Sequence, residues 1–119
     1  MRIETTAVKN EIAAIIHSGK VIVNETQDAL DLMAECSMLG ASVIIMEARH
    51  FHPDFFVLKT RLAGDILQKF SNYRMKLAIT GSFKETDSKS LHDFIFESNK
   101  QGHVIFVGSV TEAIEKLSR

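Results

Sequence analysis

The stretch from His52 to Phe83 constrains the fold more than any other part of the chain. Pro53 suits the first turn of a helix, and the apolar residues after it recur at the spacing of one helix face: Leu62, Ala63, Ile66, Leu67 and Phe70. Lys59 falls at the head of the same stripe. Residues 75–80 follow directly and have the length and composition of a buried strand. We therefore expect one amphipathic helix from Pro53 that leads into a strand of a covered sheet.

The same alternation of strand and helix extends over the rest of the chain. A Lys9-Asn10 turn predicts an opening hairpin. Strands are expected at residues 3–8, 11–17, 42–46, 75–80 and 103–107, and helices from Asn24 to Gly40, from Pro53 through Phe70, after a cap at Asp87 or Ser88, and at 111–117. The order β-β-α-β-α-β-α-β-α indicates a single α/β domain over residues 1–119 with a mixed, mostly parallel sheet. Gly64 lies inside a predicted helix at a cost of about 1 kcal/mol, which close packing on a neighbour would explain.

Composition excludes several kinds of partner. The net charge of -1 leaves no basic excess, so we expect no nucleic-acid binding. No apolar run is long enough to span a bilayer, and the first residues lack the layout of a signal peptide. The single cysteine, Cys36, excludes an internal disulfide and fits a reducing compartment. We therefore expect a cytoplasmic protein without membrane contact, with Cys36 buried and inert.

Polar residues gather where the predicted strands end, in the loops at 47–53, 81–87 and 108–109. In an open α/β sheet these loops share one rim, and the helix N-termini behind them favour anions. The candidate rim residues for binding a small anion or a partner's carboxylate are Glu47, Arg49, His50, His52, Lys59, Ser82, Lys84, Ser88 and Lys89. The alternative is that these loops are simply solvated.

Lys59 and the histidine pair admit several interpretations. A lysine held against apolar surface can act as a base or nucleophile, bind an anion, pair with Glu47, or extend its ammonium into water. His50 and His52 match no established metal-ligand spacing, so we expect neither a metal nor a cofactor. No nucleophile elbow, Walker loop or dinucleotide fingerprint is present, which argues against an enzyme.

Phe55, Phe56 and Val57 are consecutive, and one helix face cannot bury all three. They indicate either an exposed patch for a second copy of the chain or a helix covered on two sides.

Three segments carry a resemblance to a known family: QDALDLMAECSMLG (27–40), FFVLKTRLAGDILQKFSNYRMKLAITGSF (55–83) and SKSLHDFIFESNK (88–100). They resemble a bacterial family of domains of unknown function, DUF4180, and the resemblance covers nearly the whole chain. The element order also resembles that of STAS domains, the anti-sigma-factor antagonist fold, which implies a partner-binding habit. STAS antagonists are typically switched by phosphorylation of a Ser or Thr in the loop after the third strand. Residues 46–59 contain neither, so the resemblance brings no phosphosite.

These observations favour a non-catalytic regulatory or protein-interaction domain of STAS-like type, working through the rim loops and the Phe55–Phe56 region with a protein partner or a second copy. One alternative is a domain that captures a small anion with Lys59, Arg49 and the helix starts. Another is an enzyme that uses Lys59 or His50 as base and Glu47 as its partner.

Overall fold

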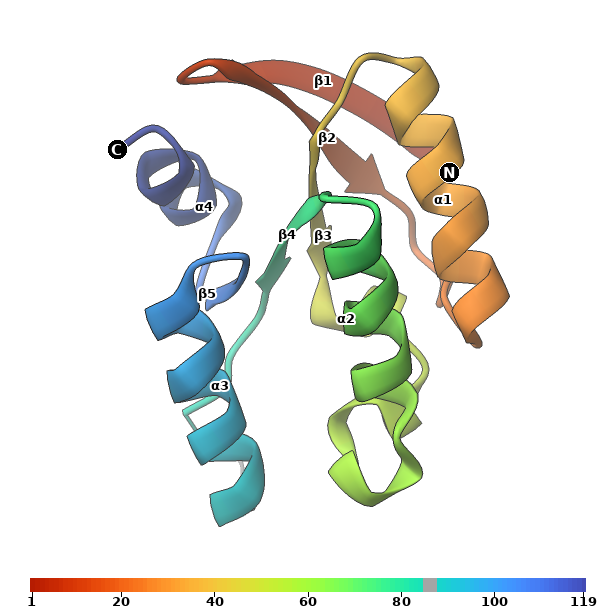
Figure 1. Cartoon of the computed structure of the whole chain (residues 1–119), viewed down its shortest axis with the longest axis vertical. Coiled ribbons are helices and arrows are strands. Elements are labelled where there is room, and N and C mark those ends of the chain that lie inside the picture. The colour runs from red at the N-terminus through yellow and green to blue at the C-terminus, as the bar shows by residue number, and fades with distance from the viewer. Residues whose placement is uncertain (85–87) are drawn as a thin grey trace.

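The computed structural model describes residues 1–84 and 88–119, and within them five strands form one sheet whose order follows the chain. The strands are β1 (Arg2–Val8), β2 (Glu11–His17), β3 (Val43–Glu47), β4 (Lys76–Thr80) and β5 (Val104–Val107). β1 pairs with β2 antiparallel, whereas β2 to β5 are parallel (Figure 1). The prediction of a mixed, mostly parallel α/β sheet with this element order is confirmed.

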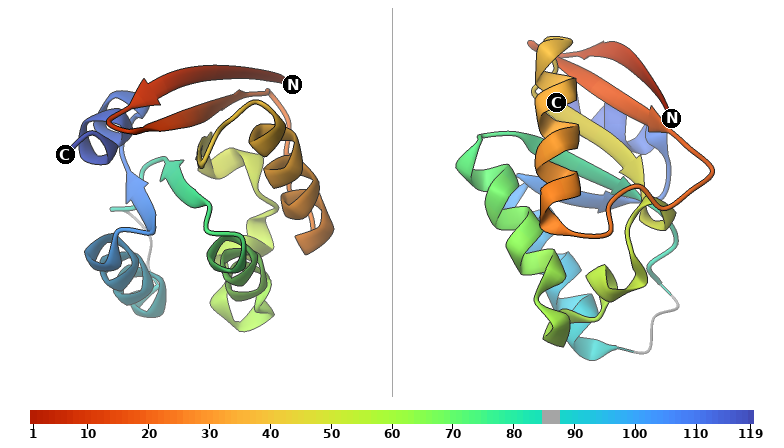
Figure 2. Two further views of the ribbon diagram at one scale, coloured as in Figure 1. Left: turned by 45° about the horizontal axis from the view of Figure 1, so that its top comes forward. Right: turned by 90° about the vertical axis from the view of Figure 1, so that its right-hand side faces the viewer.

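Three helices cover one face of the sheet and a fourth packs on the other (Figures 1 and 2). α1 (Thr26–Met38), α2 (Leu62–Asn72) and α3 (Lys89–Gln101) lie on the first face, and α4 (Val110–Leu117) lies on the second. The alternation of side chains along a strand supplies both cores. In β3, for example, Ile44 and Met46 face the first core, and Val43 and Ile45 face the second.

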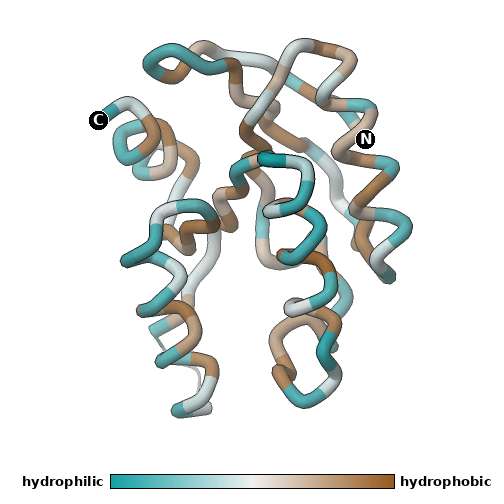
Figure 3. The backbone as a smooth tube through the Cα atoms, viewed as in Figure 1, coloured by the Kyte–Doolittle hydropathy of each residue, from teal (hydrophilic) through white to brown (hydrophobic). Residues whose placement is uncertain are grey.

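Hydrophobic and hydrophilic residues alternate along each helix, as expected when one helix face packs on a sheet (Figure 3). Both ends of α1 and of α4 lie within two residues of the predicted ones. Asp28 accepts hydrogen bonds from the N–H groups of Asn24 and Glu25, so α1 is capped one residue later than expected. Gly40 follows α1 with a left-handed φ of 84°, and Ser88 caps α3 through its hydroxyl oxygen. The other candidate cap, Asp87, lies outside the described residues.

The expected continuous helix from Pro53 to Phe70 is wrong. Two 3₁₀ turns, Pro53–Phe56 and Leu58–Thr60, precede α2, and Arg61 stands between them and the helix with a left-handed φ of 67°. The Thr60 hydroxyl holds the turns together because it lies 2.7 Å from the Asp54 carbonyl oxygen.

The broken helix resolves the problem of consecutive phenylalanines. A regular helix would point Phe55 and Phe56 about 100° apart. The two turns instead let Phe55 pack on Phe51 with ring centroids 4.3 Å apart, while Phe56 meets Phe55 edge-on at 5.0 Å.

α2 and α3 leave an open groove of about 360 Å³ between them, and Gly64 lines it. A Cβ added to Gly64 would meet no atom within 4 Å. The expected close packing at this glycine is therefore wrong. Among the described residues, no helix has the length and apolar character that crossing a bilayer requires.

Candidate functional site

The carboxyl ends of β3, β4 and β5 meet at one edge of the sheet, as expected for the rim. Glu47 pairs with Thr80 in register, and Thr80 pairs with Val107. The N–H of Gly81 donates to the Val107 carbonyl at 3.0 Å. A Cβ at Gly81 would lie only 3.1 Å from that of Ala48, so the loops after β3 and β4 touch and glycine permits the contact.

An open hollow of about 890 Å³ lies between the loops after β4 and β5 and the side of α3; we call it the rim hollow. Its polar lining consists of Ser82, Lys84, His92, Asn99, Glu112 and Lys116. Ser82 and Lys84 were predicted from the sequence, and the other four were not. One signal for Glu112 was available, since Ser109-x-x-Glu112 has the spacing of a capping box.

Glu112 is the charged centre of the rim hollow. Its carboxylate accepts a hydrogen bond from the Gly108 N–H at 3.0 Å and lies 3.4 Å from the Lys116 ammonium. The Gly108 hydrogen bond, and then Lys116 and Lys84, hold the pKa of Glu112 below its usual 4.5. Among the described residues that line the hollow, two ammonium groups thus accompany one ionised carboxylate.

Asn99 has a structural task in the same hollow. Its amide donates to the Phe106 carbonyl at 3.1 Å and accepts from the Phe106 N–H at 2.6 Å. β5 is an edge strand, so Asn99 satisfies backbone groups that a neighbouring strand would otherwise pair.

Glu47, Arg49 and His50 form a second cluster beside the rim hollow. The Arg49 guanidinium binds the Glu47 carboxylate with two contacts, at 3.0 and 3.2 Å. His50 is fully buried, and its Nδ1 accepts from the Glu47 N–H at 3.0 Å. Its Nε2 lies 3.0 Å from the Ser18 carbonyl oxygen, which can only accept, so the proton is on Nε2. His50 therefore ties the loop after β2 to the loop after β3.

The remaining candidate residues lie apart from both clusters. His52 accepts from the Asp54 N–H at 3.0 Å and caps the first 3₁₀ turn, as Ser88 caps α3. Lys89 pairs with Asp93 at 2.9 Å on the exposed side of α3.

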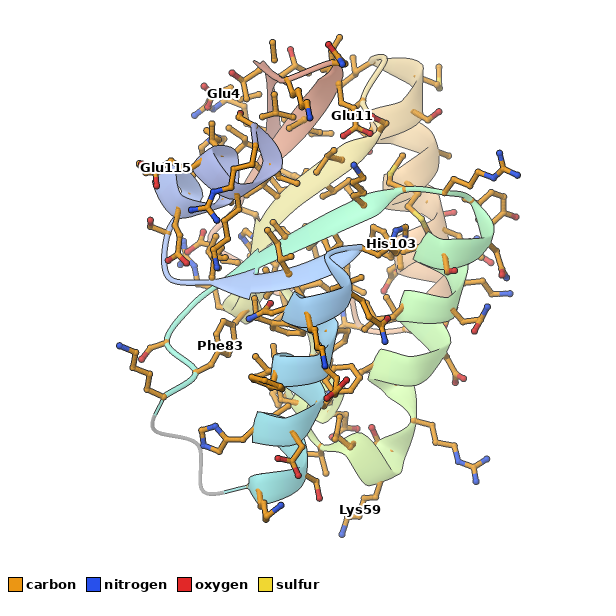
Figure 4. The ribbon with its side chains drawn as sticks, turned by 60° about the vertical axis from the view of Figure 1, so that its left-hand side comes forward. Glu4, Glu11, Lys59, Phe83, His103 and Glu115 are labelled. Atoms are coloured by element: carbon orange, nitrogen blue, oxygen red, sulfur yellow. The ribbon has the colours of Figure 1, made fainter. Side chains whose placement is uncertain are left out.

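Lys59 is not the first member of the α2 stripe. Because Arg61 reverses the backbone before α2, Lys59 sits in the second 3₁₀ turn and is exposed. Figure 4 shows it pointing away from the protein, far from Phe83 at the rim.

A continuous series of aromatic ring contacts leads to the rim hollow, which Phe83 and Phe106 line. It runs through Phe51, Phe55, Phe56, Phe83, Phe106 and Phe94, with successive centroids 4.3 to 6.2 Å apart. Phe55 is only 1% exposed and Phe56 is half-buried. Phe55 and Phe56 therefore form no exposed patch, and they are covered because they lie in a 3₁₀ turn and not on a regular helix.

Val57, next to Phe56, is 42% exposed, and the most exposed apolar side chains lie elsewhere. Met38 is 88% exposed and Leu39 50% exposed at the end of α1, and Tyr73, just after α2, is 68% exposed. Phe96 on α3 is 67% exposed. The described residues contain no group of three or more His, Cys, Asp or Glu side chains that could hold a metal ion.

Comparison with known families agrees with the motifs in the sequence. The family model described as "Domain of unknown function (DUF4180)" matches residues 8–117. No curated protein matches the chain, and no solved structure matches it either.

Proposed function

We propose, from the premise that this chain belongs to the DUF4180 family of domains of unknown function, that it is a non-catalytic protein-interaction domain with a regulatory role. One observation carries the proposal: three large apolar side chains, Met38, Leu39 and Tyr73, are half or more exposed where α1 and α2 end. Contiguous exposed apolar surface is typical of interaction sites. The STAS-like element order supports a regulatory role by analogy.

The contacts of the rim residues favour this function over catalysis. Both ring nitrogens of His50 are engaged with backbone groups, which leaves neither free to act as a base. Both carboxylate oxygens of Glu47 accept hydrogen bonds from the Arg49 guanidinium. Lys59 is exposed in the second 3₁₀ turn and does not line the rim hollow.

We place the protein in the cytoplasm, because its one cysteine is free and buried in the core.

A small-anion site is the second candidate function, and the rim hollow is the observation that favours it. Lys84 and Lys116 share that hollow with the carboxylate of Glu112, and the loop residue Ser82 adds a hydroxyl. An oxyanion of the size of phosphate would find two cations and one hydrogen-bond donor there. The Glu112 carboxylate would oppose it.

Two measurements on the purified protein separate these functions. The first is thermal unfolding with phosphate, sulfate, nucleotides and acidic metabolites at constant ionic strength. A ligand that binds only the folded state raises Tm, by about 2.7 kcal/mol of stabilisation at one hundred times its Kd. The interaction domain should show no specific rise. A rise that Lys84→Ala abolishes would establish the anion site instead.

The second measurement is capture of a partner from an extract of the cells that make the protein, with mass spectrometry to identify it. The complex should re-form from the two purified proteins, and calorimetry should give the same Kd for wild type and Lys84→Ala. No reconstituted complex in repeated captures would contradict the proposed function.

A further inference from the structure

An apolar stripe runs along the side of α1 that borders the end of α2. Leu30, Ala34 and Met38 recur at intervals of four residues, so they lie on one helix face. Leu30 and Ala34 line a hollow of about 430 Å³ that Tyr73 closes from the end of α2. We call Leu30, Ala34, Met38 and Tyr73 the α1 patch. Methionine suits such a surface because its flexible side chain adapts to an irregular partner.

The charged side chains of α1 itself all have one sign. α1 contains Asp28, Asp31 and Glu35 and no lysine or arginine. Asp28 is used as a cap, but no ion pair among the described residues involves Asp31 or Glu35. Asp31 lines the hollow of the patch and also a second one of about 300 Å³, which Glu35 shares.

The nearest basic residues in sequence do not cancel these charges. Lys76, which follows the lining residue Met75, is paired with Glu11 at 3.0 Å. Arg74 follows Tyr73 and lies beyond α2, outside the lining of the hollow. Met1, which carries the α-ammonium, lines the second hollow with Asp28, Asp31 and Glu35, so one cation stands against three carboxylates there. The α1 patch is therefore apolar and bordered by a surplus of carboxylates, and Asp31 and Glu35 form no ion pair among the described residues.

We propose that the α1 patch is the docking surface, and that its partner is a protein segment that presents basic and apolar residues together, as a cationic amphipathic helix does. The inference rests on the proposed function, because it names the partner of the same interaction domain. The apolar side of the segment covers Leu30, Met38 and Tyr73, and its lysines or arginines meet Asp31 and Glu35. Complementary charge speeds association and selects among partners.

The same charges argue against other occupants. A symmetric dimer through this patch would place the same surface of each copy against the other. The carboxylates of two α1 helices would then be brought together. An anionic lipid surface or a nucleic acid would meet the same repulsion.

The test uses a fluorescent peptide of leucine and lysine at helical spacing, with a second peptide in which glutamate replaces every lysine. Anisotropy should show saturable binding of the lysine peptide to wild type, weakening as salt rises, and no binding of the glutamate peptide. Met38→Ser and Asp31→Lys should each weaken binding by about tenfold or more. Absence of binding to wild type, or equal binding of both peptides, overturns the proposal.

Two matched variants control for general effects. Phe96→Ser removes an exposed apolar side chain from α3, and Glu115→Lys reverses an exposed charge on α4. Both should bind the lysine peptide as wild type does, with all variants melting cooperatively. If Glu115→Lys weakens binding as much as Asp31→Lys, net charge rather than the α1 patch is responsible, and the proposal fails.

The natural partner identified by capture separates this inference from the proposed function. Loss of that partner from Met38→Ser and Asp31→Lys, but not from Phe96→Ser, supports both. Undiminished binding of the partner to the two α1 variants overturns the α1 patch as the docking surface and leaves the interaction function standing.

Discussion

Gly64→Ala should stabilise the protein. Gly64 lies inside α2, and its φ is not among the positive values, which among the glycines belong to Gly40 and Gly102. An added Cβ meets nothing within 4 Å, so no steric cost opposes the gain in helix propensity. That gain is about 0.8 to 1 kcal/mol in a helix interior. With an unfolding entropy of about 2.1 cal/mol/K per residue, it corresponds to a Tm increase of roughly 4 °C for a chain of this length.

Gly102→Ala is the matched control. A Cβ at Gly102 also meets nothing within 4 Å, but its φ is 82°, where it ends α3. A left-handed conformation costs an alanine about 1 to 2 kcal/mol, so this variant should lose stability. The two glycines thus differ in backbone conformation and share the open space around them.

Urea unfolding followed by circular dichroism measures both changes, and an unchanged m-value shows that the midpoint shift reports stability. A Gly64→Ala variant that is less stable than wild type would refute the reasoning, because α2 and α3 would then have to close over Gly64. A neutral Gly102→Ala would refute the contrast.

Further predictions concern three single residues: Cys36, Glu112 and Lys59. Burial, with a smaller effect of Glu35, raises the pKa of Cys36 to about 11. Ellman's reagent at pH 8 should therefore label this thiol only after urea is added. Rapid labelling of the native protein would contradict the burial of Cys36. Because this thiol ionises from about pH 9 in the unfolded chain, its contribution to stability should decline as pH rises from there to about 11. The pKa of Glu112 is lower in the folded protein than its usual 4.5, so its carboxylate stabilises the fold above pH 4.5, and this stabilisation is lost as the pH falls through the lower folded pKa. Glu112→Gln should therefore lose less stability in acid than wild type does, as measured by urea titrations at several pH values. Lys59→Met should change the free energy of unfolding by less than about 0.5 kcal/mol, and a loss above about 2 kcal/mol would reveal a paired, buried ammonium.

The loops of the predicted rim meet at one edge of the sheet, but the structure does not bring all the candidate residues together there. Strand direction follows from the alternation of strands and helices, so the loops at 47–53 and 81–84 could be placed at one edge without coordinates. Lys59 was placed by a helical wheel that assumed an unbroken helix. Glu112 and Lys116 were missed because they belong to α4, which packs on the other face of the sheet and reaches the hollow through these two side chains.

Local sequence determined the order of strands and helices, the opening hairpin and most helix ends, because apolar periodicity and capping depend on residues only a few positions apart. Tertiary structure decided where the helix expected from Pro53 to Phe70 is interrupted. Phe56 packs on Phe51 and Phe55 and also meets Phe83, which belongs to a later part of the chain and in turn contacts Phe106. Local periodicity carries no information about such distant partners. The energy of burying these rings outweighs the local preference for one continuous helix, and Arg61 takes up the change in direction.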